Sequence, residues 1–111
     1  MKRQVLFVGY DNSNQAEISA FLDSHEGEAR FAVSTDMAIQ MLEAEPISAV
    51  VLKIRQLNDA AILQYINRYY PEIKVLVSAG QRFDNIINIF SRGNFKLLHQ
   101  PLKLKELGML L

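Results

Sequence analysis

The sequence contains no cysteine and no long apolar run, and these absences exclude several classes of protein. Without cysteine, the 111-residue chain has no disulfide, no thiolate nucleophile and no cysteine metal ligand. No apolar run approaches the roughly 20 residues of a transmembrane helix. The run Val5–Val8 is too short for the core of a signal peptide. We therefore expect a cytoplasmic protein that does not enter a membrane.

Net charge and enzyme motifs are missing as well. The 12 basic and 12 acidic residues cancel, so we expect no direct binding to nucleic acid or to an anionic membrane. The chain has no glycine-rich phosphate loop, no H-E-x-x-H helix and no nucleophile with a plausible base. His25 and His99 have no second ligand at metal spacing, and His25 is expected on the inward stripe of a helix, near its C-terminal end. We expect neither an enzyme nor a metal or other cofactor.

Apolar runs of strand length determine the expected fold. The clearest is Ile47–Ile54, which is rich in valine and isoleucine and does not alternate with polar residues until Lys53. Such a run is typical of a strand that is buried on both faces in a parallel sheet. Further strands are predicted at Val5–Val8, Ala29–Val33, Lys74–Ser78 and Lys96–His99.

Segments with apolar residues at helical spacing follow each of these strands. The first has Ile18, Phe21, Leu22 and His25 inward, with a capping box of Asn14 and Glu17 at its start and Gly27 at its end. The second is capped by Ser34 or Thr35 and runs through Ala44, with Ala38, Met41 and Leu42 inward. The third is capped by Asn58 or Asp59, with Ile62, Leu63, Ile66 and Tyr69 inward. A fourth is marked by Ile86, Ile87 and Phe90, and the last follows Pro101 with Leu104, Leu107 and Leu111 inward.

This alternation predicts one α/β domain over residues 1–111. Helices between successive strands imply parallel pairing with right-handed crossovers, and the expected sheet is a doubly wound, flavodoxin-like (βα)5 with strand order 2-1-3-4-5. Ligands of such sheets bind at the carboxyl ends of the strands, at the switch point between the first and third. The residues expected along that edge are Gly9, Tyr10, Asp11, Lys53, Ser78, Gln100 and Pro101.

Several of these segments together resemble a known family. Over residues 4–111 the chain resembles the receiver domain of bacterial two-component response regulators. The segments that match are Val5–Val8, the pair Ile18 and Leu22, Ser48–Leu52, Tyr70–Val75, Ser78–Ala79, and Gly93 with Pro101 at the family's spacing. The resemblance implies a regulatory domain at the N-terminus of a longer protein. The last helix reaches Leu110 and Leu111 without a cap, so we expect either that it is cut short there or that it links to a second domain.

The resemblance also implies a chemistry that the residues of this chain do not match. In the family, two acids after the first strand hold Mg²⁺, and an aspartate ending the third strand accepts a phosphoryl group. A Ser or Thr ending the fourth strand and a lysine before the fifth-strand proline bind the phosphoryl oxygens. Here Gly9 and Tyr10 replace the acids, Lys53 the acceptor and Gln100 the lysine. The hydroxyl survives as Ser78, or is lost if counting from Pro71 selects Ala79.

A lysine amine cannot form an acyl phosphate, and a cation at these positions would meet the positive charge of Lys53 instead of carboxylates. We therefore predict a pseudo-receiver, with the fold but not the phosphorylation chemistry. Lys53 itself would pair with Asp11 or Asp59, extend to water, or contact a ligand or partner.

Three functions are compatible with this prediction. The first is a protein-interaction module that contacts a partner, an attached output domain or a second copy of itself. The interaction face implied by the resemblance is Ile89, Arg92, Phe95, Lys96, Lys103 and Lys105. The second is a sensor in which Lys53 and Ser78 bind a small anion. The third is an active receiver in which Asp11 or Asp59 moves into the pocket.

Overall fold

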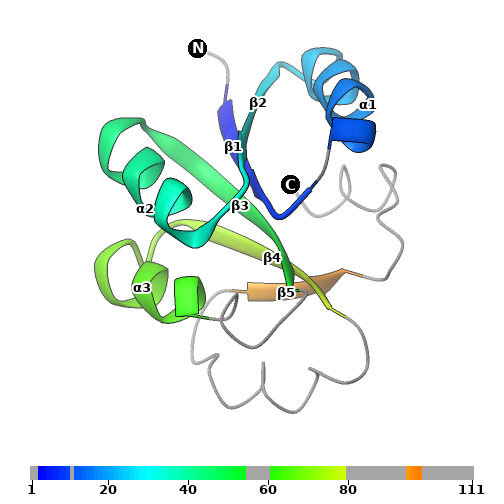
Figure 1. Cartoon of the computed structure of the whole chain (residues 1–111). Helices are drawn as coiled ribbons and strands as arrows, with labels where there is room; N and C mark the ends of the chain where they lie inside the picture. Colours follow the sequence, from blue (N-terminus) through cyan, green and yellow to red (C-terminus); the bar gives the residue numbers. More distant parts are fainter. Residues whose placement is uncertain (1–2, 11, 55–60, 80–94, 99–111) are drawn as a thin grey trace.

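The computed structural model describes residues 3–10, 12–54, 61–79 and 95–98. These residues form a parallel sheet with helices on both faces (Figure 1). The strands are β1 (Arg3–Val8), β2 (Gly27–Ala32), β3 (Ile47–Ile54), β4 (Lys74–Ala79) and β5 (Phe95–Leu98). The described helices are α1 (Asn12–Asp23), α2 (Thr35–Ala44) and α3 (Ala61–Tyr69). The strand order β2-β1-β3-β4-β5, with every pair parallel, confirms the predicted flavodoxin-like topology.

Strand β3 lies in the middle of the sheet, and its predicted bounds are confirmed. Val50 and Val51 point to opposite faces and are both 0% exposed. Both faces of this strand are therefore covered, which explains why its sequence is apolar at consecutive positions.

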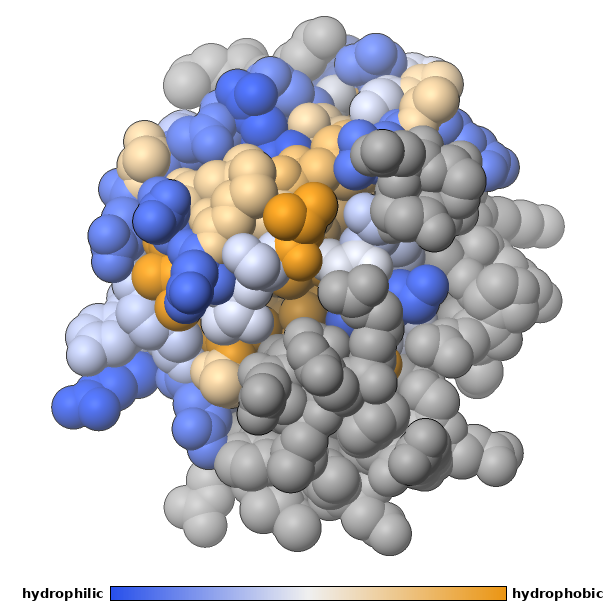
Figure 2. All heavy atoms as spheres, in the orientation of Figure 1, coloured by the Kyte–Doolittle hydropathy of each residue, from blue (hydrophilic) through white to orange (hydrophobic). Residues whose placement is uncertain are grey.

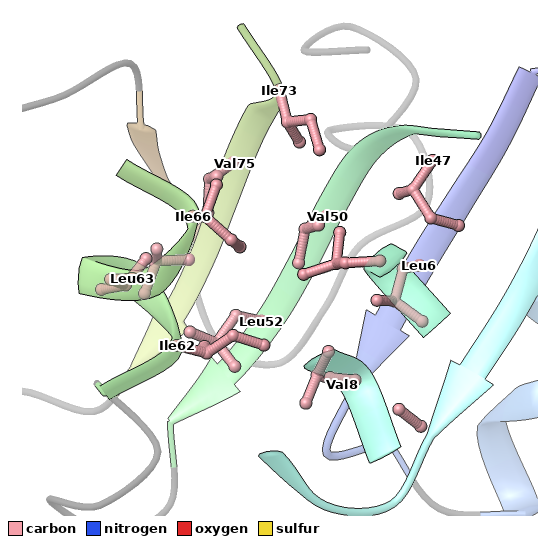
Figure 3. Packing of buried hydrophobic residues seen from close by; sticks show 14 of the residues in the cluster. Leu6, Val8, Ile47, Val50, Leu52, Ile62, Leu63, Ile66, Ile73 and Val75 are labelled. Carbon is pink, nitrogen blue, oxygen red and sulfur yellow. The ribbon is translucent and has the colours of Figure 1, made fainter. Parts of the chain in front are cut away.

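Helices α2 and α3 cover one face of the sheet (Figure 1). Ile62, Leu63 and Ile66 of α3 point toward β3 and β4, and Val50 and Leu52 meet them from the sheet (Figure 3). From α2, Ala38 and Leu42 join the same cluster and Met41 packs at its margin, as predicted. Burying side chains of this size stabilises the fold by about 1.5–3 kcal/mol each.

Helix α1 lies on the other face, where Ile18 and Leu22 pack against β1 and β3. Its predicted ends are wrong: the helix starts at Asn12, so Asn14 lies inside it, and it stops at Asp23. The turn that follows explains the stop, because His25 Nδ1 lies 2.9 Å from the Phe21 carbonyl oxygen. His25 thus has the predicted place at the C-terminal end, but its side chain is exposed rather than inward.

Strand β2 begins two residues earlier than predicted and ends at Ala32 rather than Val33. Its bounds follow the register with β1, in which Arg3 pairs with Gly27 and Val8 with Ala32. Gly27 therefore opens a strand and does not terminate a helix. In the same way, β5 is shifted one residue toward the N-terminus relative to the prediction, because Phe95 pairs with Val75.

Tyr69 was predicted to face inward but is 58% exposed. Tyr69 is the last residue of α3. Its ring packs on Tyr65, with ring centroids 4.9 Å apart, and the centroid of the Tyr69 ring lies 5.5 Å from Arg68 Cζ. The predicted caps Asn58 and Asp59 and the two predicted helices after β4 and β5 lie outside the described residues. No helix in the described ranges is long and apolar enough to cross a membrane.

Apolar side chains gather in the middle of the face that Figure 2 shows, and hydrophilic side chains lie above and to the left of them. Among the described residues, Val33 and Met37 are large apolar side chains that remain 68% and 40% exposed. Val33 precedes α2 and Met37 lies in its first turn. The fold therefore leaves apolar surface at the start of this helix.

Candidate functional site

The carboxyl ends of β1, β3 and β4 lie side by side and form the predicted site. In the register of these strands Val8 pairs with Leu52, and Lys53 pairs with Ser78. The structure therefore brings together Gly9, Tyr10, Lys53 and Ser78, which come from three separate parts of the sequence.

Gly9 is the first residue after β1, and its backbone has φ 89°. This is the left-handed region, which glycine enters without the steric cost that a Cβ brings. Its N–H donates a hydrogen bond to the Ala32 carbonyl oxygen at 3.1 Å, which ties the turn to the end of β2. An aspartate at this position would be strained, so the backbone itself disfavours the family's metal-binding acid here.

Tyr10 fills the space beside this turn. Its side chain is 4% exposed, and its ring stands edge-on to Phe7 with ring centroids 5.8 Å apart. Burial raises its pKa from 10.0 to about 12, while the nearby Ser78 hydroxyl acts in the opposite direction. The phenol oxygen nevertheless makes no hydrogen bond of ordinary geometry with the described residues. Tyr10 is therefore a neutral core residue.

Lys53 is half-buried at the end of β3 and contacts that tyrosine. Its Nζ lies 5.8 Å from the centroid of the Tyr10 ring. A cation within about 6 Å of an aromatic face is stabilised by about 0.5–2 kcal/mol. No sequence pattern indicates this contact, because it depends on how β1 and β3 are aligned. The predicted ion-pair partners, Asp11 and Asp59, lie outside the described residues.

Ser78 is 2% exposed, and among the described residues it is the polar residue that lies fully in the core. Since it pairs with Lys53 whereas Ala79 pairs with Ile54, the register favours Ser78 for the hydroxyl position. The arrangement places one ammonium, one phenol and one hydroxyl at the switch point, without a carboxylate among these residues.

The remaining predicted residues cannot be placed in this site. Asp11, Gln100 and Pro101 lie outside the described residues, as do Ile89, Arg92, Lys103 and Lys105 of the predicted interaction face. Phe95 and Lys96 belong to β5. Within the described ranges, no three His, Asp or Glu side chains are grouped so that they could hold a metal ion. That result leaves the expected absence of Mg²⁺ a prediction, since Asp11 is not among them.

Comparison with known proteins shows similarity to response regulators. No family model matches the sequence. An NtrX-like response regulator of Rickettsia conorii is 27% identical over 112 residues, covering 96% of this chain and 24% of the relative. The corresponding protein of Rickettsia bellii is 25% identical over the same share of this chain and 23% of its own length. The chain thus spans about a quarter of the length of the curated relatives it matches.

Solved structures show the same fold. A CheY-like response regulator receiver domain protein of Methanospirillum hungatei has a TM-score of 0.82 at 12% identity, covering 98% of this chain and 90% of that one. NtrX of Brucella abortus, solved in complex with ADP, has a TM-score of 0.80 at 23% identity, covering 98% of this chain and 25% of that one. The chain therefore has the CheY-like receiver fold, and along 96% of its length it is similar in sequence to an NtrX-like response regulator.

Proposed function

We propose that this receiver domain does not accept a phosphoryl group and that it acts in signal transduction as a protein-interaction module. One observation carries the proposal: the acceptor position at the end of β3 holds Lys53, whose ammonium lies 5.8 Å from the ring of the buried Tyr10. The position therefore has no carboxylate to phosphorylate, and its surroundings favour a cation on the protein.

The turn after β1 supports the same proposal. An Mg²⁺ ion needs oxygen ligands, preferably carboxylates, near the phosphoryl group. The two positions that supply them in the family are here Gly9, in a left-handed conformation, and Tyr10, which is packed in the core. Neither side chain can bind the ion, so the metal-assisted transfer lacks its metal site as well as its acceptor.

This arrangement also argues against the alternative of a small-anion sensor at Lys53 and Ser78. The Lys53 ammonium already lies 5.8 Å from the centroid of the Tyr10 ring, and the ring itself is buried, so the ammonium has a partner other than an anion. A protein-interaction role has independent support from the apolar surface that Val33 and Met37 leave at the start of α2. Exposed apolar patches of this kind are typical of contact surfaces.

The partner class follows from the length of the relatives. Because the NtrX-like regulators are about four times as long as the part that this chain matches, the proposed partner is an output domain attached to the receiver, or a second receiver. A cytoplasmic location is part of the same proposal, since response regulators receive and transmit signals there.

The test is intact-mass spectrometry after incubation with Mg²⁺ and acetyl phosphate. We expect no added phosphoryl group, while a receiver domain that has all its acidic residues, treated in parallel, gains one. A single addition that hydroxylamine removes would contradict the proposal, because hydroxylamine cleaves acyl phosphates. Peptide mapping would then show whether Asp11 or Asp59 is the acceptor.

A Lys53→Asp variant makes the test more specific. It restores the acceptor carboxylate but leaves Gly9 and Tyr10 in place of the metal ligands. We expect this variant also to remain unmodified, since the metal ligands are still missing. If Lys53→Asp were phosphorylated while the unmodified protein was not, Gly9 and Tyr10 would not prevent phosphoryl transfer.

A further inference from the structure

A cavity of about 570 Å³ lies at the edge of the sheet where the strands begin, at the opposite end from Lys53. It is bordered by the end of α1 and by the first residues of β1, β2, β3 and β4. Small-molecule sites typically have volumes of about 300–1,000 Å³. The cavity therefore has the size of a small-ligand site, and it is separate from the switch point.

An irregularity in strand β3 shapes this edge of the sheet. Gln4 of β1 pairs with Ile47. The next residue of β1 pairs with Ala49, so Ser48 is left without a partner in that strand. Such a β-bulge bends the strand and redirects a side chain. Ser48 is exposed and lines the cavity, so the bulge places a small side chain where a larger one would fill the space.

The inner wall of the cavity is apolar. Val5, Leu22 and Ala49 are buried and belong to the core that α1 forms with the sheet. Phe21, half-buried at the margin of this core, adds an aromatic ring to the lining. Aromatic rings attract one another in edge-to-face and offset arrangements, beyond the gain from buried area. The wall therefore favours a ligand with an aromatic body.

His25 brings one hydrogen-bonding atom to this lining. Its ring lies on Phe21, with ring centroids 4.3 Å apart, and its Nδ1 lies 2.9 Å from the Phe21 carbonyl oxygen. Because a carbonyl oxygen only accepts hydrogen bonds, Nδ1 carries the proton of the neutral ring, and Nε2 is then an acceptor. Nε2 makes no hydrogen bond to the described residues. His25 therefore offers a ligand an acceptor and no donor.

We propose that this cavity binds a small neutral aromatic molecule with one O–H or N–H donor, of the chemical class of phenols and indoles. The aromatic body would lie on Phe21 and Leu22, and the donor would bond to His25 Nε2. Arg3 and Lys74 also line the cavity, but each makes an interaction of its own within the protein, so the proposal uses neither charge. It goes beyond the interaction module, because it gives the domain a separate site for a regulatory signal.

The test is an amide NMR titration of the whole chain with indole, using 1-methylindole as the match that lacks the donor. We expect both to cause saturable shifts at the end of α1 and at the first residues of β1 and β3. The affinity should be about tenfold higher for indole, because only indole can bond to His25 Nε2. His25→Phe keeps a ring against Phe21 without the acceptor, so it should bind both ligands as the unmodified protein binds 1-methylindole.

A second variant fills the cavity without touching the core. Ser48 lines the cavity but is exposed, so Ser48→Phe should abolish both titrations while the unliganded spectrum stays folded. Ser48→Ala is the matched control at the same position. It removes the hydroxyl without filling the space, and it should bind both ligands as the unmodified protein does.

Four results would overturn the proposal: no saturable shifts, equal affinity for the two ligands in the unmodified protein, a preference for indole that survives His25→Phe, or undiminished binding by Ser48→Phe. Loss of binding by Ser48→Ala would also overturn it, because the hydroxyl and not the apolar wall would then hold the ligand. Shifts centred on Tyr10, Lys53 and Ser78 would overturn it by assigning the binding to the other edge. None of these results bears on the mass-spectrometric test, so the two proposals fail independently.

Discussion

Tyr10 is the described residue that most distinguishes this switch point from that of receiver domains. It stands where the family has an acid, yet it is buried against Phe7 and its ring lies 5.8 Å from the Lys53 ammonium. Its phenol is buried without a hydrogen bond to the described residues. Such a group must stay neutral, because ionisation would place an unpaired charge in the core.

Raised pH should therefore destabilise the domain through Tyr10. Its pKa is about 12 in the folded state against 10.0 ordinarily. Below pH 10 both states keep the proton, and between pH 10 and 12 the unfolded chain loses it first, so folding stability falls as pH rises through this window. Tyr10→Phe should reduce the decline in unfolding free energy between about pH 9 and about pH 11 by about 1 kcal/mol.

Urea unfolding followed by circular dichroism measures this difference. Tyr69→Phe is the matched control, since that side chain is 58% exposed. If Tyr10→Phe declined as steeply as the unmodified protein, the phenol would not be held neutral by the core.

At the scale of the element, helix α2 shows how a local sequence signal fixes a boundary. Ser34 has extended backbone, with φ −143° and ψ 163°, and its Oγ accepts a hydrogen bond from the Met37 N–H at 3.2 Å. Asp36 in the first turn complements the helix dipole. At the other end the Glu45 N–H donates to the Met41 carbonyl oxygen at 2.9 Å before Pro46.

Removing the cap should destabilise the protein measurably. Ser34→Ala deletes the acceptor of an N–H at the helix start, and we expect the free energy of unfolding to fall by about 1 kcal/mol. Ser34→Asp retains an acceptor and should lose little. The check is chemical denaturation, with Ser48→Ala as an exposed serine that caps no helix. Equal stabilities for the two alanine variants would show that the cap contributes nothing.

At the scale of the whole molecule, the balance of 12 basic and 12 acidic residues removes long-range repulsion between copies at neutral pH. The predicted interaction face, with Ile89 and Phe95 as its apolar residues, would then let two receivers associate weakly. We expect sedimentation to show a shift from monomer toward dimer between micromolar and millimolar concentration. Ile89→Lys should weaken the association, whereas Gln64→Lys, at an exposed position of α3, should not. Monomer at all concentrations would exclude a homodimer.

The accuracy with which the sequence predicts the bounds of an element differs between elements for a physical reason. Strand β3 could be predicted to the residue because both its faces are buried, so burial itself selects apolar side chains along it. Strand β2 could not, since it carries Glu28 and Arg30 and its start is set by hydrogen bonds to β1. Tyr69 was misplaced because helical spacing continues past the point where the helix covers the sheet.

The sequence by itself determined the topology of this protein, because the order of strands and helices follows from residue type and from local periodicity. The replacement of the family's acids is implied by the resemblance to receiver domains. Only the tertiary structure decided that Tyr10 lies against Lys53, that Ser78 rather than Ala79 pairs with Lys53, and that a cavity forms where the strands begin. Each of these depends on the register of parallel strands that are far apart in the chain. Register is set by the packing of the whole sheet, and no short stretch of sequence encodes it.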